Sequence, residues 1–190
     1  MTKDQVLEIF RKSNALLEGH FRLTSGRHSN RYMQCAQVLQ YPDYTAALCG
    51  EIVEAFREDQ VDVVIGPAMG GIIVAYEVGR QLGVRTLFTE RENGAMTLRR
   101  NFSIAPGERV LVVEDVVTTG GSVWEVIKVV QESGGQLVGV GVLVDRSNGT
   151  VDFGVKTKPV LQMEVVSWEA EECPLCKEGL PVVKPGSRQA

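Results

Sequence analysis

Two neighbouring carboxylates, Glu114 and Asp115, stand a few residues before a loop rich in hydroxyls and glycines, TTGGS at residues 118–122. When such a loop opens a helix, its unpaired backbone N–H groups form a binding site for an anion such as phosphate. Carboxylates repel phosphate, but they accept hydrogen bonds from the hydroxyls of a sugar that carries one. The pattern therefore indicates a site for a phosphorylated sugar. The alternative is an ordinary strand–helix loop with solvated acids.

The residues on either side of this stretch predict the elements that hold it. The run VLVV at residues 110–113 is continuously apolar, as in a strand that is buried on both faces. Ser122 and Glu125 have the S-x-x-E spacing of a capping box, which predicts the start of a helix. No lysine follows Gly120 and Gly121, and the stretch has no G-x-G-x-x-G fingerprint, so an ATPase loop and a dinucleotide site are both disfavoured.

Predicted strands and helices alternate along the chain, which favours an α/β fold with a mostly parallel sheet and right-handed crossovers. A capping box at Thr2 and Gln5 predicts a first helix that ends near Gly19. Residues 32–39 are predicted to form a strand, and residues 160–166 the last strand.

Polar loops follow three of the predicted strands, at residues 66–71, 114–122 and 145–149. Ligands of parallel sheets bind beyond the carboxyl ends of the strands. We therefore expect the three loops to open on one crevice.

Asn93 and Gly94 form the strongest short signal for a hairpin turn, and Arg91, Arg99 and Arg100 flank them. A basic hairpin beside an anion site is a candidate for a lid. The alternative is an exposed hairpin whose arginines are solvated.

Composition limits the classes of protein that remain. The 190 residues suffice for one domain with a substantial core, and 44% hydrophobic with 23% charged residues is typical of a globular protein. The net charge of −4 does not indicate a nucleic-acid-binding surface, and no apolar run is long enough to span a bilayer. The N-terminus lacks the apolar segment of a signal peptide, so we expect a cytoplasmic protein.

The tail contains one C-x-x-C pair, Cys173 and Cys176. Such a pair can be half of a zinc site or a redox pair, but no second pair follows it. His20 and His28 lie far away in the sequence. We therefore expect a plain reduced pair in a surface knuckle.

Residues 110–122 resemble the signature of type I phosphoribosyltransferases for phosphoribosyl pyrophosphate (PRPP): an apolar strand, two acids, two more residues and T-x-G followed by Thr, Gly or Ser. Residues 17–29, LEGHFRLTSGRHS, and Arg146 at the end of a predicted strand resemble the orotate phosphoribosyltransferases of that family. The loop at residues 66–72 resembles the family's pyrophosphate loop. The tail, CPLCKEGLPVVKPGSR at residues 173–188, resembles a bacterial branch similar to the enzyme of Thermus.

This resemblance implies a type I phosphoribosyltransferase fold in one domain, residues 1–190, with a mostly parallel twisted sheet flanked by helices. It implies a small hood, from roughly residues 1–40 and the C-terminal tail, over a core of roughly residues 41–166. The implied activity transfers the phosphoribosyl group of PRPP to orotate, giving orotidine 5′-phosphate and pyrophosphate in pyrimidine biosynthesis. A cytoplasmic homodimer is implied, with Mg²⁺ bound mainly through PRPP and with no nucleic-acid or membrane partner.

The resemblance also implies roles for individual residues. Glu114 and Asp115 are the expected catalytic acids, which hold the ribose hydroxyls near the positive charge that develops at the reacting carbon. Thr118 and Arg146 are expected to bind orotate, whose planar carboxylate suits a guanidinium. No side chain is expected to be a dedicated metal ligand. The expected PRPP-binding residues are Glu114, Asp115, Val116, Val117, Thr118, Thr119, Gly120, Gly121, Ser122 and Arg91.

The sequence departs from the family where cations are usual. Many members have lysine at the positions of Thr24 and Gly70, and lysines and a histidine in the segment after Arg91. Arg99 and Arg100 are candidates to replace them, across a dimer. Two alternatives stay open: a phosphoribosyltransferase for a purine base, and a PRPP-sensing regulator, which the missing lysines motivate.

Overall fold

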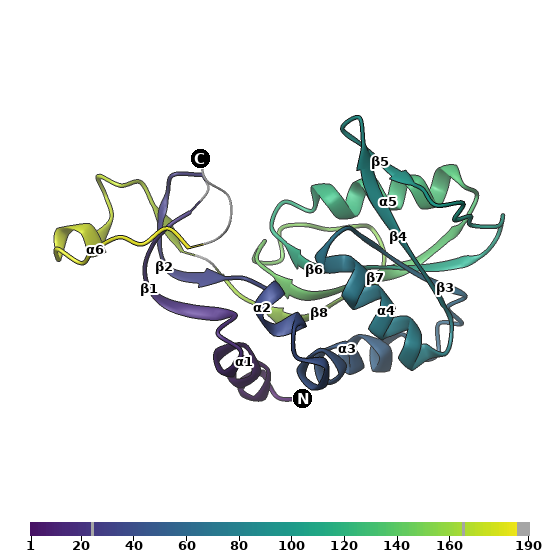
Figure 1. The fold of residues 1–190 in the computed structure, drawn as a ribbon, viewed down its shortest axis with the longest axis horizontal. Coiled ribbons are helices and arrows are strands. Elements are labelled where there is room, and N and C mark those ends of the chain that lie inside the picture. Colours follow the sequence, from purple (N-terminus) through teal and green to yellow (C-terminus); the bar gives the residue numbers. More distant parts are fainter. Residues whose placement is uncertain (24, 165, 186–190) are drawn as a thin grey trace.

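The chain forms two β-sheets of unequal size, as the computed structural model in Figure 1 shows. The structure describes residues 1–23, 25–164 and 166–185, so Thr24 lies outside the described residues. The larger sheet has the order β5-β4-β3-β6-β7-β8, and its neighbouring strands are parallel except for β4 and β5. The predicted mostly parallel sheet is confirmed. Its strands are β3 (Val63–Pro67), β4 (Arg85–Glu92), β5 (Ala95–Leu98), β6 (Arg109–Val117), β7 (Gln136–Asp145) and β8 (Thr157–Gln162).

Helices cover both faces of the larger sheet (Figure 1). Helices α3 (Pro42–Phe56) and α4 (Gly70–Leu82) pack on one face, and α1 (Lys3–Lys12) adds its apolar side to the same cluster. Helix α5 (Gly121–Glu132) packs on the other face. None of the helices in the described part of the chain is both long and apolar enough to cross a membrane.

Strand β6 lies between these two layers. Leu111 and Val113 point into the cluster on the α3 side, whereas Val110 and Val112 point into the cluster on the α5 side. All four side chains are fully buried. The apolar run therefore forms the predicted strand with two buried faces, and it fixes the position of the acids that follow it.

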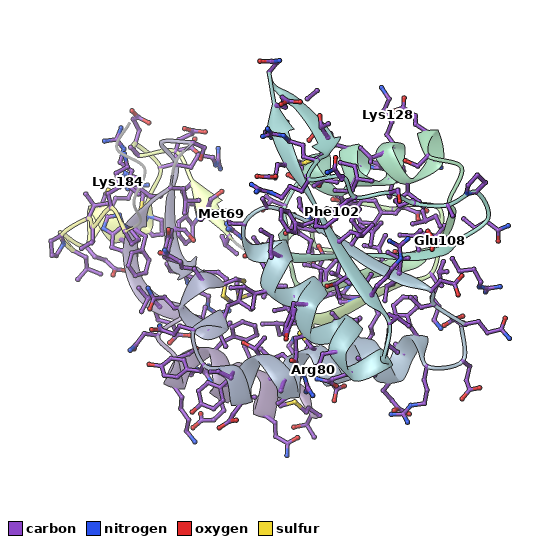
Figure 2. The ribbon with its side chains drawn as sticks, turned by 45° about the vertical axis from the view of Figure 1, so that its right-hand side comes forward. Met69, Arg80, Phe102, Glu108, Lys128 and Lys184 are labelled. Carbon is purple, nitrogen blue, oxygen red and sulfur yellow. The ribbon has the colours of Figure 1, made fainter. Side chains whose placement is uncertain are left out.

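The smaller sheet is built from both ends of the chain and has the order β1-β2-β9. Its strands are β1 (Leu16–Arg22), β2 (His28–Met33) and β9 (Ser167–Trp168). After β9 the tail passes through the short helix α6 (Pro174–Lys177) and returns to the outer edge of β1, where Val183 pairs with Phe21. Figure 2 shows Lys184, the next residue of the tail, beside this sheet.

Three predicted boundaries are wrong. The first helix ends at Lys12, because Asn14 adopts a left-handed φ of 55° and residues 16–22 leave as strand β1. The predicted strand at residues 32–39 ends at Met33 and is followed by the short helix α2 (Ala36–Leu39). The last predicted strand lies earlier, as β8, and β9 follows it in the other sheet. In the first two cases the apolar pattern did not distinguish a strand from a helical turn.

Candidate active site

Three loops converge at the carboxyl ends of β3, β6 and β7, as the sequence predicted. Gly70, at the start of α4, lies so close to β6 that a Cβ atom there would overlap the carboxylate of Asp115. The backbone N–H of Arg146 donates to the carbonyl oxygen of Val117, with a distance of 2.7 Å between nitrogen and oxygen. The pyrophosphate-type loop, the acid pair and the arginine therefore face one crevice.

The glycine-rich loop encloses a cavity of 200 Å³ at the start of α5. Helix α5 begins at Gly121, and its N-cap residue, Gly120, has a φ of 77°. A Cβ atom at position 120 would come within 2.8 Å of a methyl group of Val151, so the position requires glycine for two reasons. The cavity is lined by Glu114, Val116, Val117, Thr118, Thr119, Gly120, Gly121, Ser122 and Val123.

The predicted capping box at Ser122 and Glu125 is wrong. Among the described residues no side chain caps α5, because the helix starts before Ser122, which lies inside the first turn. The carboxylate of Glu125 instead binds Arg91. The N–H groups of the first turn are therefore not satisfied by a cap, which suits a site for a phosphate ligand.

The acid pair is buried at the end of β6. One oxygen of Glu114 accepts the backbone N–H of Asp115 at 3.0 Å, and one oxygen of Asp115 accepts the N–H of Val116 at 2.8 Å. Burial, and next the neighbouring charge of Asp115, raises the pKa of Glu114 to about 9. Burial also raises the pKa of Asp115. Burial therefore disfavours the charged form of both acids in the ligand-free site.

A second cavity, of 440 Å³, lies between the loops and the smaller sheet. Arg146 is half-buried and lines this cavity, and its buried Nε has no hydrogen-bond partner among the described residues. Burial lowers the pKa of this arginine. A planar carboxylate in the cavity would offer an acceptor to this guanidinium and offset the cost of its partial burial. The cavity is lined by Leu23, Ser25, Tyr32, Met33, Thr118, Arg146 and Ser167.

Five of those lining residues were not predicted: Leu23, Ser25, Tyr32, Met33 and Ser167. They come from the smaller sheet and its β1–β2 turn, which are far in the sequence from the PRPP signature. Leu23 and Ser25 lie in the segment 17–29 that carries the family resemblance, whereas no local pattern marks Tyr32, Met33 and Ser167.

The hairpin predicted at Asn93 and Gly94 is confirmed, with φ of 51° and 85° at the two turn residues. Arg91, on β4, donates from Nη1 to Glu125 of α5 at 3.1 Å and from Nη2 to the other oxygen of the same carboxylate. The hairpin is therefore fastened to the helix that follows the anion loop. The assignment of Arg91 to PRPP stays a prediction.

The other two arginines of the hairpin also have acidic partners. Arg99 pairs with Glu92 at 3.3 Å, and Arg100 pairs through two hydrogen bonds with Glu90. Both are held within the hairpin in this conformation. Their proposed replacement of the family's lysines stays a prediction.

The structure also brings together four side chains that lie far apart in the sequence. His20 and His28 approach Cys173 and Cys176, and the potential ligand atoms of all four lie within 4.8 Å of one another. The expectation of a plain cysteine pair therefore left out its two histidine neighbours. These lie about 150 residues away in the sequence, and His20 and Cys173 are separated by 153 positions. No spacing rule links the two segments.

Comparison with known proteins places this site in a family. The profile described as "Phosphoribosyl transferase domain" matches residues 37–172, which contain the larger sheet and the three converging loops. Phosphoribosyltransferases are therefore the class that the fold and the site define.

Individual relatives narrow the class. The chain is 67% identical over 189 residues to the orotate phosphoribosyltransferase of Pelotomaculum thermopropionicum, with 100% of each chain covered. It is 68% identical over 190 residues to that of Heliobacterium modesticaldum, covering 99% of this chain and 100% of the relative. The crystal structure of orotate phosphoribosyltransferase from Aeropyrum pernix aligns with a TM-score of 0.72 at 27% identity, covering 83% of this chain and 93% of the other. The chain belongs to the orotate phosphoribosyltransferase family.

Proposed function

We propose that this chain transfers the phosphoribosyl group of PRPP to orotate and releases pyrophosphate, as a step of pyrimidine biosynthesis. The observation that carries the choice of orotate is the half-buried guanidinium of Arg146, which lines the same cavity as Thr118 of the anion loop and whose Nε has no partner among the described residues. A base with a carboxylate would pair with this half-buried cation, whereas a neutral purine would not supply a counter-charge.

The geometry supports separate roles for the anion loop and the acid pair in binding the sugar phosphate. The loop at the start of α5 offers backbone N–H groups to the 5′-phosphate, and the acid pair at the end of β6 lies beside the same cavity. Glu114 and Asp115 would accept hydrogen bonds from the ribose hydroxyls. They would lie near C1, where positive charge develops as pyrophosphate leaves with the bonding electrons. A ring nitrogen of orotate, held by Arg146, then forms the new bond to C1.

The acid pair also fits Mg²⁺, a hard cation that prefers oxygen ligands and usually retains water and substrate oxygens in its coordination shell. In the described part of the chain no third acidic side chain joins Glu114 and Asp115 to form a larger carboxylate cluster. Most ligands of the ion would thus come from PRPP, and the acids would hold it through one or two oxygens. When bound, the ion would neutralise charge on the departing pyrophosphate.

The decisive test compares bases that differ at one group. The protein is incubated with PRPP and Mg²⁺ and with orotate, uracil, adenine, guanine or hypoxanthine, and pyrophosphate release is measured. Uracil is the matched control, because it has the ring of orotate without the carboxylate. We expect orotate to be used at least about 100-fold better than uracil, the loss that follows from leaving a buried charge unpaired.

Two results would contradict the proposal. Release with a purine but not with orotate would assign the chain to the purine-base alternative. PRPP binding without release for any base would favour the PRPP-sensing regulator.

We further propose, from the family resemblance, that the enzyme is a cytoplasmic homodimer and that the smaller sheet with the tail acts as a hood over the base pocket. The lining of the 440 Å³ cavity by Tyr32, Met33 and Ser167 supports the hood assignment. Sedimentation equilibrium tests the oligomeric state: a mass near the 20.8 kDa of one chain would contradict the dimer.

A further inference from the structure

A compact cluster of metal-ligating side chains lies outside the proposed active site, where the tail meets the smaller sheet. His20 of β1 and His28 of β2 supply one ring nitrogen each, and Cys173 and Cys176 supply one sulfur each from the two ends of a C-x-x-C turn. Both histidines and Cys173 are buried. This set of two nitrogens and two sulfurs is a common ligand set of structural zinc sites.

Four of the six distances between the ligand atoms are close to those of a tetrahedral site. For usual Zn–N and Zn–S bond lengths, tetrahedral geometry puts two nitrogens about 3.3 Å apart and a nitrogen and a sulfur about 3.6 Å apart. Here Nε2 of His20 lies 2.9 Å from Nδ1 of His28. The sulfurs of Cys173 and Cys176 lie 3.5 Å and 3.7 Å from Nε2 of His20, and Cys176 lies 3.2 Å from Nδ1 of His28.

Hydrogen bonding alone does not account for this arrangement. Nε2 of His20 is approached by three groups at once, one nitrogen and two sulfurs. A neutral imidazole nitrogen without a hydrogen has one lone pair in the ring plane, so it can accept one of these contacts well. A cation at the centre of the four atoms satisfies all of them together.

The opposite side of the His20 ring is arranged as in metal sites. Its Nδ1 lies 2.8 Å from the carbonyl oxygen of Leu180, an acceptor only, so Nδ1 carries the hydrogen and donates it. This assignment leaves Nε2 with its lone pair directed at the cluster. A second hydrogen bond of this kind fixes the tautomer and orientation of most metal-ligating histidines.

The tail has a structural need for such a link. Among residues 169–185 Cys173 is the one buried residue, and Leu180, Val182 and Val183 are exposed. The tail thus contributes almost no apolar surface to a core, and its described backbone pairing with β1 is one short bridge around Val183. Small segments without a core are commonly held by a metal or a disulfide.

We propose that His20, His28, Cys173 and Cys176 bind one Zn²⁺ ion, which fastens the C-terminal tail to the hairpin of the smaller sheet. The two thiols bind as thiolates and release their protons to solvent. Zinc is favoured over Mg²⁺ or Ca²⁺, which take oxygen ligands, because sulfur and imidazole select softer ions in tetrahedral geometry. A disulfide between the cysteines would use both sulfurs and leave the two histidines facing each other without the ion.

The test measures metal directly. The protein is purified with a reductant and no added chelator, and zinc is quantified by mass spectrometry after removal of loosely bound ions on a desalting column. We expect about one zinc per chain in the wild type, and less than about a tenth of that in Cys176→Ser. The matched control is Cys49→Ala, which removes a buried cysteine of α3 far from the cluster and should retain the ion.

Two further measurements keep the proposal falsifiable if Cys176→Ser folds poorly. Wild-type protein freed of zinc should take up one equivalent of Co²⁺ with the visible absorption bands of a tetrahedral site that has thiolate ligands, and zinc should displace them. Bound zinc should also slow alkylation of Cys173 and Cys176 at least about tenfold relative to the metal-free protein. A wild type that contains no zinc and takes up no Co²⁺ under reducing conditions, or one whose cysteines form a disulfide, would overturn the proposal.

Discussion

Glu114 holds a proton in the folded protein that it would lose in the unfolded chain. Its pKa rises from an unfolded value of 4.5 to about 9, because it is buried beside Asp115. For an acid with a raised pKa, the protonated form stabilises the fold below pH 4.5, and this contribution is lost as pH rises towards about 9. Ionisation of Glu114 therefore destabilises the ligand-free protein in that window.

The destabilisation that ionised Glu114 causes leads to a prediction for Glu114→Gln, whose side chain is neutral at every pH. The variant should gain at least about 1 kcal/mol at pH ~8, or about 3 °C in Tm, and almost nothing at pH ~5. Its use of PRPP should fall, because an amide is a weaker acceptor for the ribose hydroxyls. Thermal unfolding of the ligand-free variant and wild type at both pH values tests this, and an equal gain at both would contradict it.

Arg146 should act on orotate and not on PRPP. Arg146→Ala should raise the KM for orotate by about 100-fold, since a charged hydrogen-bonded pair is lost from a buried pocket. Arg146→Lys should recover part of this loss, because it keeps the charge but not the planar fork. Steady-state pyrophosphate release with each substrate varied gives both constants. An unchanged orotate KM in Arg146→Ala would remove this residue from the pocket.

Gly70 explains one of the missing lysines. No side chain fits at this position while Asp115 keeps its carboxylate in the observed place. Gly70→Ala should therefore displace that carboxylate and raise the KM for PRPP about tenfold, with the fold intact, because alanine is favourable in a helix. Gly50→Ala is the matched control: it also lies in a helix, α3, but is open to a side chain, and its KM should not change.

At the scale of single residues, the sequence predicted those positions that a local pattern identifies. Glu114, Asp115 and Arg146 stand at strand ends, and parallel strands bring their ends together whatever the details of the loops. The zinc ligands were missed because His20 and Cys173 are 153 residues apart, and only the return of the tail to β1 makes them neighbours.

Among the elements, the β4–β5 hairpin has a contact that bears on catalysis. Arg91 binds Glu125 across an exposed surface, and such a pair contributes between about 0 and 1 kcal/mol. If Arg91 binds PRPP, as the resemblance implies, it must first leave Glu125. The helix after the anion loop therefore competes with the substrate for this arginine.

A double-mutant cycle tests that competition. Glu125→Ala should lower the KM for PRPP by up to about fivefold, Arg91→Ala should raise it, and Glu125→Ala should have no effect in the Arg91→Ala background. Glu132→Ala, which removes a carboxylate at the far end of the same helix, is the control. A fall in KM that persists without Arg91 would show that Glu125 acts through net charge and not through this arginine.

Helices and strands could be predicted where the period of the apolar residues and the length of the segment indicated the same element. Their ends were less predictable. Residues 110–113 and the turn at Asn93 and Gly94 follow rules of burial and backbone conformation that act locally. The end of α1 depended on the left-handed Asn14, and the cap of α5 on where the helix begins. Both helix ends depend on the backbone conformation of a single residue, which the pattern of apolar residues does not reveal.

Across the whole molecule, the proposed zinc site and the base pocket share one strand. His28 begins β2, while Tyr32 and Met33 near its other end line the 440 Å³ cavity. Strand β9, which leads into the tail, pairs with β2 and contributes Ser167 to the same wall. Arg27 adds a hydrogen bond of 2.9 Å to the hydroxyl of Ser167. A tail fastened by the ion therefore holds both strands of the wall that faces Arg146.

Loss of the ion should loosen that wall without touching the PRPP loop. In Cys176→Ser the KM for orotate should rise about fivefold, equivalent to about 1 kcal/mol, while the KM for PRPP and kcat stay near the wild-type values. Cys49→Ala should change none of the three constants. The measurement is steady-state pyrophosphate release with Mg²⁺ in excess, on protein whose zinc content is known. A parallel rise in the KM for both substrates would contradict a local effect, since the anion loop and the acid pair belong to the larger sheet and do not depend on the tail.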